Sequence, residues 1–291
     1  MFEVLDCKRL AVWVMVMSEE NGQREKPREL FARAVFAMDN GVWFRDLFST
    51  VCKAGVDPAV DMKMSGVGFR MMDRSRVYMW DVWLDRSFFS TYECSRSGRR
   101  CFPLRNILGV ALNSVRRNSA VKFSVDGKKD LLIVEVRDRI SREYEFTLTD
   151  DYEETIPLPN IKFASAYTFN LKALYEDLKG LDRSGYRYVK FSGNRKTFII
   201  EAENDDSTSC SKRAKFTYEI GGDGGLVDCK IRKRSVSKYS LDMLLELLNP
   251  KLSDLVTLRY SSNMPMKIEY HVDNKDSKIN CYLAPVIVVD E

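Results

Sequence analysis

The sequence predicts an α+β protein built as two halves of similar pattern. Three observations support this prediction. The order strand, helix, several strands, helix, several strands occurs twice along the 291 residues. An acidic segment that ends in prolines separates the two passes. A content of 45% hydrophobic and 30% charged residues is typical of a globular protein with a substantial core.

In the first half, helices are predicted at Asn40–Cys52 and Leu104–Val115. Asp39 and Asn40 provide a start signal for the first helix, whose apolar residues recur at helical spacing. The Ser65-Gly66 pair predicts a tight turn between the first two of several short strands. These predicted strands are Val60–Met64, Val67–Met72, Val77–Leu84, Phe88–Cys94, Val121–Val125, Leu131–Val136 and Tyr144–Leu148.

The second half repeats this order without detectable sequence identity to the first. An extended Tyr167–Phe169 leads into a helix at Leu171–Leu181, and a further helix spans Leu241–Leu248. The glycines at 221–225 carry no Lys-Ser/Thr and open no helix, which favours a hairpin loop over a phosphate cradle. The remaining strands are predicted at Tyr188–Phe191, Thr197–Glu201, Ala214–Ile220, Val227–Ile231, Val256–Tyr260, Met266–Val272 and Ile279–Leu283.

The segment 149–160 between the halves has four acids in five residues, followed by two prolines. Such a stretch does not fit inside a sheet, so it is interpreted as a linker. The predicted organisation is an extension at 1–29, a domain at 30–148, a connector at 149–162 and a second domain at 163–291. The apolar run Leu10–Met17 superficially resembles a signal peptide, but it is short and lacks a small-residue cleavage site. An extra strand or a loosely attached extension is expected there instead.

The residues argue against an enzyme. The chain has one histidine, His271, and contains no nucleotide-binding, nucleophile-elbow or zinc-protease motif. Its seven cysteines form no close pair, so neither a metal site nor a cofactor is expected. No apolar stretch is long enough to span a membrane. The net charge of +4 is weak evidence for a nucleic-acid partner unless the bases gather on one surface.

Short stretches in the same order resemble the proliferating cell nuclear antigen (PCNA) family of DNA sliding clamps. Pro265 to Tyr270, followed by Tyr282-Leu-Ala-Pro285, resembles the C-terminal strands of that family. Ser65–Val77 resembles its early hairpin, and Ile156-Pro-Leu-Pro159 resembles the end of its interdomain connector. The resemblance covers about residues 31–291.

This resemblance implies the DNA clamp fold, in which each half is a domain of antiparallel sheet with two helices. Three subunits close head-to-tail into a six-domain homotrimeric ring around duplex DNA, which the ring contacts independently of sequence. The implied partners are DNA polymerase and other clients with a glutamine-aromatic docking motif, and a clamp loader. The strands expected to pair between subunits are Arg142–Leu148 and Ser211–Tyr218, through Glu143, Tyr144, Glu145, Phe146, Lys212, Arg213, Lys215, Phe216 and Tyr218.

The surface expected to face DNA is where the chain departs from the family. Family helices carry several bases, whereas here acids such as Asp46, Glu176 and Asp177 stand among them, and the helix 241–248 has no base. Positive charge gathers instead around residues 96–105 and 230–234. The expected DNA-facing residues are Arg45, Lys53, Arg105, Arg116, Arg117, Lys172 and Lys179.

The client-binding pocket is better matched. By resemblance, an apolar pocket beneath the connector receives the docking motif, and apolar or aromatic residues from three distant segments match it. These pocket residues are Met72, Val77, Ile156, Leu158, Pro159, Pro265, Tyr282, Ala284, Pro285 and Ile287.

Two alternatives stay open at the level of sequence. The weakly basic helices and the N-terminal extension are compatible with a checkpoint-type clamp subunit in a heterotrimeric signalling platform. A β-rich interaction module explains the composition but not the ordered motifs. A nuclear location is expected if the source has a nucleus, and a cytoplasmic one otherwise.

Overall fold

The computed structural model describes residues 32–150, 156–203 and 213–286. Its strands form three antiparallel sheets, with the orders β5-β1-β7-β8-β9, β14-β10-β16-β17-β18-β4-β3-β2-β6 and β13-β12-β11-β15. The strands of the first half are β1 (Arg33–Met38), β2 (Ala59–Lys63), β3 (Gly66–Met72), β4 (Tyr78–Asp85), β5 (Thr91–Arg96), β6 (Gly98–Cys101), β7 (Ala120–Asp126), β8 (Leu131–Arg137) and β9 (Ser141–Thr147). Those of the second half are β10 (Ser165–Asn170), β11 (Tyr188–Gly193), β12 (Thr197–Glu203), β13 (Arg213–Glu219), β14 (Leu226–Ile231), β15 (Ser237–Ser240), β16 (Leu255–Tyr260), β17 (Met266–Tyr270) and β18 (Lys278–Leu283).

The regular helices begin where the sequence places a capping side chain. The side chains of Asn40, Asn170 and Ser240 accept a hydrogen bond from the backbone N–H three residues on. Each thereby satisfies one of the N–H groups that the first turn leaves unpaired. The helices they open are α2 (Gly41–Val51), α4 (Leu171–Arg183) and α5 (Leu241–Leu247).

Within one continuous hydrophobic core, each half has its own group of packed aromatic rings. Phe36, Phe44 and Phe123 pack together in the first half, and Tyr167, Phe198 and Tyr260 in the second. The nine-stranded sheet nevertheless continues from one half to the other, because β18 pairs with β4. The predicted residue boundaries of the two domains therefore stay a prediction, while the α+β class and the doubled element order are confirmed.

Three predicted elements differ from the structure. The helix expected at Leu104–Val115 is irregular: a single α turn, α3 (Leu104–Asn106), passes into a π-helical stretch, Ile107–Ala111, and a 3₁₀ turn, Leu112–Ser114. Pro103 precedes this segment and provides no side-chain cap. The strand expected at Phe88–Cys94 begins only at Thr91, after a 3₁₀ turn at Arg86–Phe88, and Tyr167–Phe169 is part of the longer β10.

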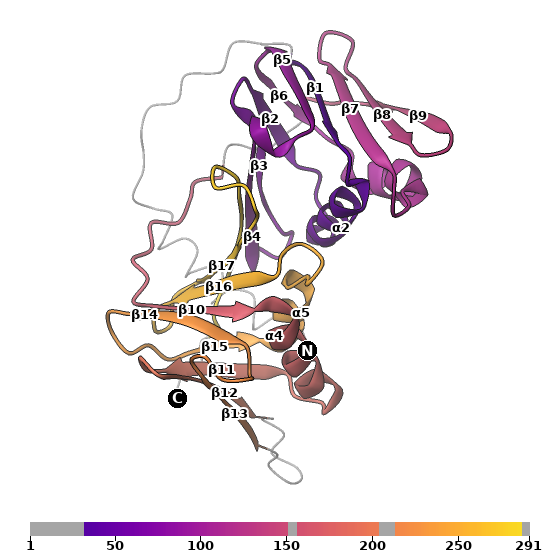
Figure 1. Cartoon of the computed structure of the whole chain (residues 1–291). Coiled ribbons are helices and arrows are strands. Elements are labelled where there is room, and N and C mark those ends of the chain that lie inside the picture. Colours follow the sequence, from indigo (N-terminus) through magenta and orange to yellow (C-terminus); the bar gives the residue numbers. More distant parts are fainter. Residues whose placement is uncertain (1–31, 151–155, 204–212, 287–291) are drawn as a thin grey trace, which may run out of the picture.

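The helices gather on one side of the chain, and the nine-stranded sheet faces the other. In Figure 1, α2, α4 and α5 lie along one flank, while residues 156–164, which lead into the second half, descend along the opposite flank. Side chains on α2 contact the segment after α5: Trp43 Nε1 donates to the Leu252 carbonyl at 3.1 Å, and Asn249 Nδ2 donates to Thr50 Oγ1 at 2.7 Å. The predicted extension at 1–29 lies outside the described residues. Among those residues, none of the helices has the length and apolar character needed to cross a membrane.

Candidate functional site

A small apolar cluster lies on the sheet surface beneath the connector, on the side away from the helices. Met79, Tyr282 and Ala284 are buried in it, and Met72, Ile156 and Phe163 pack around them. The strand register explains the grouping, because Met72 lies opposite Met79 and Met79 opposite Tyr282. Residues directly opposite in antiparallel strands share a face, so β3, β4 and β18 present one continuous apolar row.

The structure brings together four of the ten predicted pocket residues, namely Met72, Ile156, Tyr282 and Ala284, in the apolar cluster. Val77 is buried in the main core, although its carbonyl accepts a hydrogen bond from the Ala284 N–H at 2.9 Å. Leu158 is 40% exposed. Pro159, Pro265 and Pro285 are buried, and Ile287 lies outside the described residues. Met79 and Phe163 belong to the cluster but were not predicted.

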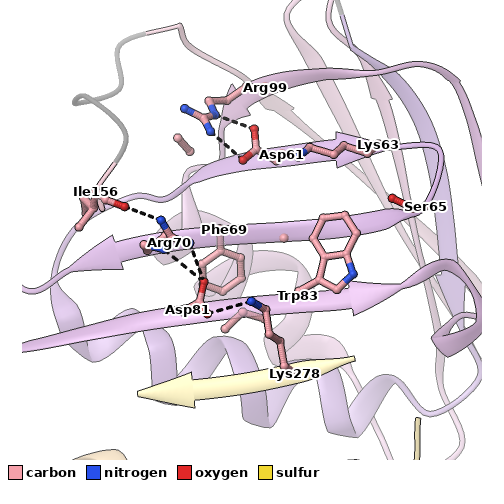
Figure 2. Close-up of a pocket in the computed structure, with 13 residues that line it drawn as sticks. Asp61, Lys63, Ser65, Phe69, Arg70, Asp81, Trp83, Arg99, Ile156 and Lys278 are labelled. Carbon is pink, nitrogen blue, oxygen red and sulfur yellow. Dashed lines mark hydrogen bonds and ion pairs between the residues drawn. The ribbon is translucent and has the colours of Figure 1, made fainter. Parts of the chain in front are cut away.

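An arginine ties the connector to the sheet beside this cluster. Arg70 Nη1 donates to the Ile156 carbonyl at 2.5 Å, while its Nε and Nη2 both lie 3.2 Å from Asp81 Oδ1. Lys278 Nζ lies 3.2 Å from the other oxygen of Asp81. Figure 2 shows the three side chains in a line across β3, β4 and β18, ending at Ile156. Strand periodicity could have indicated this group, because Arg70 and Met72 are two residues apart and share a face.

The same face forms a groove of about 570 Å³ next to the apolar cluster. Its lining mixes charge with aromatic surface. Arg99 makes a bidentate pair with Asp61 at 2.7 Å, and Lys63 Nζ lies 5.8 Å from the ring centre of Trp83 (Figure 2). Among the described residues, no group of three or more metal-ligating side chains is present in this groove or elsewhere.

The strands predicted to join subunits are β9 and β13, which are edge strands at opposite ends of the folded molecule (Figure 1). Within the described residues, β9 pairs only with β8, and β13 only with β12. Glu143 and Glu145 are exposed on β9, and Arg213 and Lys215 on β13. Tyr144, Phe146 and Phe216 are half-buried, Tyr218 is buried, and Lys212 lies outside the described residues.

The predicted DNA-facing residues lie on or just after helices, but two of them also bond within the chain. Arg45 Nη1 donates to the Val115 carbonyl at 3.2 Å, and Lys53 Nζ donates to the Glu246 carbonyl at 3.0 Å. Lys179 is half-buried, with its Nζ 5.6 Å from the ring centre of Tyr175. The exposed members of the set are Lys53, Arg105, Arg116, Arg117 and Lys172.

The acids that interrupt the bases on the helices have structural partners. The Tyr218 hydroxyl donates to Asp177 at 2.9 Å, and the Tyr78 hydroxyl donates to Glu246 at 2.9 Å. Burial, reinforced by the neighbouring carboxylate, raises the pKa of each of these tyrosines far above its usual value. Both hydroxyls therefore stay protonated and keep donating, and the acids fasten the helices to β13 and β4.

Comparison with known proteins gives one consistent result. No family profile matches the chain. A curated relative from Pyrococcus horikoshii, named DNA polymerase sliding clamp, is 24% identical over 243 residues, which is 83% of this chain and 94% of the relative. The DNA polymerase sliding clamp of Thermococcus gammatolerans is 24% identical over 248 residues, covering 85% of this chain and 96% of the relative.

Solved structures agree on the fold. PCNA from Thermococcus kodakaraensis superposes with a TM-score of 0.78 at 21% identity, over 87% of this chain and 99% of that one. The PCNA2–PCNA3 complex from Sulfolobus tokodaii gives a TM-score of 0.76 at 19% identity, over 86% and 98% of the two chains. At these coverages the match extends into both halves of the chain. The chain is therefore a divergent relative of the PCNA-type sliding clamps and has their fold.

Proposed function

We propose that this chain is the subunit of a DNA sliding clamp, a ring that encircles duplex DNA and tethers DNA polymerase and other client proteins without catalysing a reaction. The likeness to DNA polymerase sliding clamps along both halves is the observation that carries the proposal. A ring holds DNA by enclosure, so it stays bound without tight contacts and can move along the duplex. Its contacts with phosphates are independent of sequence and weakened by salt.

The two edge strands support ring closure by head-to-tail pairing. Pairing β9 of one subunit with β13 of the next would satisfy the open backbone groups of both strands. β9 carries exposed glutamates and β13 exposed bases, and this charge contrast would favour pairing of the two strands. A homotrimer is the proposed assembly.

The apolar cluster beneath the connector is the proposed docking site for clients. A short peptide with a glutamine, an apolar residue and paired aromatics would cover Met72, Tyr282 and Ala284 from the open side. A clamp loader and a nuclear location in a nucleated source belong to the same proposal. The checkpoint-type alternative is not favoured, because the relatives are named as clamps of DNA polymerase.

Loading onto DNA tests the ring. The purified protein should have about three times its chain mass of 33.7 kDa in solution. Once loaded onto closed circular DNA, the protein should stay bound in high salt and should be released when the circle is cut. Equal loss from circular and linear DNA would contradict topological tethering, and a monomer that assembles only with other clamp-like chains would favour the checkpoint alternative.

Peptide titration tests the docking site separately. Replacing Ile156 and Leu158 with alanine should weaken binding of a glutamine-aromatic peptide. Ile156 packs on the apolar cluster, whereas Leu158 is exposed, so the two single variants should differ. Unchanged affinity in the double variant would refute docking at this cluster.

A further inference from the structure

A run of exposed bases lies next to the end of the connector and has no role in the proposed ring. This basic segment comprises Lys230, Arg232, Lys233 and Arg234, at the end of β14 and just after it. No ion pair joins any of the four to a carboxylate within the described parts of the chain. Four neighbouring cations without internal partners indicate a surface suited to an anionic ligand.

The backbone of the basic segment is fixed against the cluster. The N–H groups of Arg232 and Lys233 both donate to the carbonyl of Ala164, at 2.8 and 3.3 Å. The preceding residue, Phe163, packs on the apolar cluster. The backbone of the bases is thus bonded to the residue that follows Phe163, which connects the segment to the edge of the proposed docking site.

Further bonds hold the segment on that side. Ser165 Oγ donates to the Lys233 carbonyl at 2.9 Å, and the Val236 N–H donates to Ser262 Oγ at 3.0 Å. Ser262 lies three residues before the buried Pro265. Exposed Lys162, whose carbonyl accepts from Ser261 Oγ at 3.1 Å, adds a fifth base next to Phe163. Anchored backbone with exposed side chains favours binding, because less chain must be ordered when a ligand arrives.

The position of the segment argues against a role in the DNA channel. β14 begins opposite Phe169, just before α4, and ends at Ile231 opposite Ser165. The bases thus follow the end of β14 that is remote from the start of α4, where the connector enters the second half (Figure 1). In the sheet order, β10, β16 and β17 lie between β14 and β18, so a peptide bound at the apolar cluster would reach the bases with the residues that flank its docking motif.

We infer that the basic segment selects clients whose docking motif is flanked by acidic residues. This inference rests on the proposed docking of clients at the apolar cluster. The motif would be held by Met72, Tyr282 and Ala284, while glutamates or aspartates next to it face Arg232, Lys233 and Arg234. Exposed ion pairs contribute modestly, up to about fivefold in affinity each, so the segment would rank clients rather than create binding.

Three peptides with the same glutamine-aromatic motif test the inference. One has neutral flanks, and the other two carry three glutamates, either before or after the motif. Wild-type protein at low salt should bind one glutamate peptide about tenfold more tightly than the neutral one, and salt should reduce the difference. Replacing Arg232, Lys233 and Arg234 with glutamine should abolish the difference and leave the neutral peptide unaffected. The matched control replaces Lys128, Arg139 and Lys275, which are exposed in other turns, and should keep the difference.

The outcomes separate the possible errors. Equal affinity of wild-type protein for all three peptides would overturn the inference while leaving docking intact. The same loss in the control variant would attribute the effect to net charge alone and would also overturn it. A short linear duplex whose binding depends on the three bases, with no peptide effect, would assign the surface to nucleic acid. Failure of every peptide to bind would overturn docking at the cluster and this inference with it.

Discussion

Replacing Arg70 with methionine should separate the stability of the sheet from the position of the connector. Arg70 contacts both Asp81 and the Ile156 carbonyl, and it is the bond to Ile156 that holds the connector. Methionine keeps most of the apolar length of the side chain and removes the guanidinium. Asp81 keeps Lys278 as a partner, so the variant does not leave its carboxylate without a cation.

The magnitude follows from the kind of bond removed. A hydrogen bond from a charged donor contributes about 1.5–3 kcal/mol, and the Arg70 side chain is only 24% exposed, which limits competition from water. Losing the pair and the bond should lower the free energy of unfolding by about 1.5–3 kcal/mol. A connector no longer anchored at Ile156 must be ordered when a client binds. Peptide affinity should therefore fall roughly three- to tenfold.

The matched control is Arg259→Met. Arg259 pairs with Glu269, which Lys267 also contacts, so the group repeats the arginine, acid and lysine arrangement on β16 and β17. No hydrogen bond or ion pair joins Arg259 to the described residues of the connector. Chemical denaturation and fluorescence anisotropy with a labelled client peptide should show both variants destabilised but only Arg70→Met impaired in binding. Suppose that Arg70→Met loses as much stability as Arg259→Met but binds the peptide within twofold of wild type. That result would refute the role of Arg70 in anchoring the connector.

Three further predictions follow from the same contacts. Replacing Glu143 and Glu145 with lysine should weaken the trimer, by under about 1 kcal/mol for each exposed ion pair that is lost. Adding Arg213→Glu and Lys215→Glu should restore the trimer, as measured by sedimentation. Absence of this rescue would argue against β9–β13 pairing. Asn249→Ala removes the bonds to Thr50 and the Asp46 carbonyl and should lower the free energy of unfolding by about 1–2 kcal/mol in denaturant titrations. Burial works to raise the pKa of Glu269, but Lys267 and Arg259 outweigh it and hold that pKa below its usual value. The ionised Glu269 thus stabilises the fold above about pH 4.3, and this stabilisation is lost as the pH falls through the lower pKa of the folded state. The denaturation midpoints of wild type and Glu269→Gln should therefore converge in acid. A difference between the midpoints that does not change with pH would contradict this prediction.

Elements with strong local signals could be predicted from the sequence. Asn40 and Asn170 cap α2 and α4 where a polar residue precedes an apolar helical pattern. The strands β1, β6 and β15 were not predicted. β15 is only four residues long, polar and aromatic, and has no clear strand pattern of its own. It forms a strand because it pairs with β11, so the residues that determine its conformation lie far away in the sequence. β6 contains Arg99 and Arg100, which resemble a solvated loop until their partners are known.

Arg100 shows why such partners are invisible in a linear sequence. Its guanidinium is almost fully buried, with Nη1 2.9 Å from Asp150 and Nη2 2.8 Å from the Gly127 carbonyl. A buried arginine is stable only where several acceptors converge on it, and here they come from the β7–β8 turn and the start of the connector. The apolar cluster has the same character. Met72 and Tyr282 could be named by resemblance, whereas Phe163 joins them only because the end of the connector folds back onto the sheet.

The acids on the helix face change what the proposed ring must rely on. Asp177 and Glu246 accept hydrogen bonds from tyrosines, so exchanging them for lysines would strengthen the attraction for DNA at the cost of bonds that position the helices. Arg45 and Lys53 are partly occupied by carbonyl acceptors. Within the described residues, Arg105, Arg116, Arg117 and Lys172 remain exposed and make no such bond. The contact of these bases with phosphates would be weakened by salt. Retention on DNA must then come from closure of the ring, and the pairing of β9 with β13 becomes the step on which the proposed function depends most.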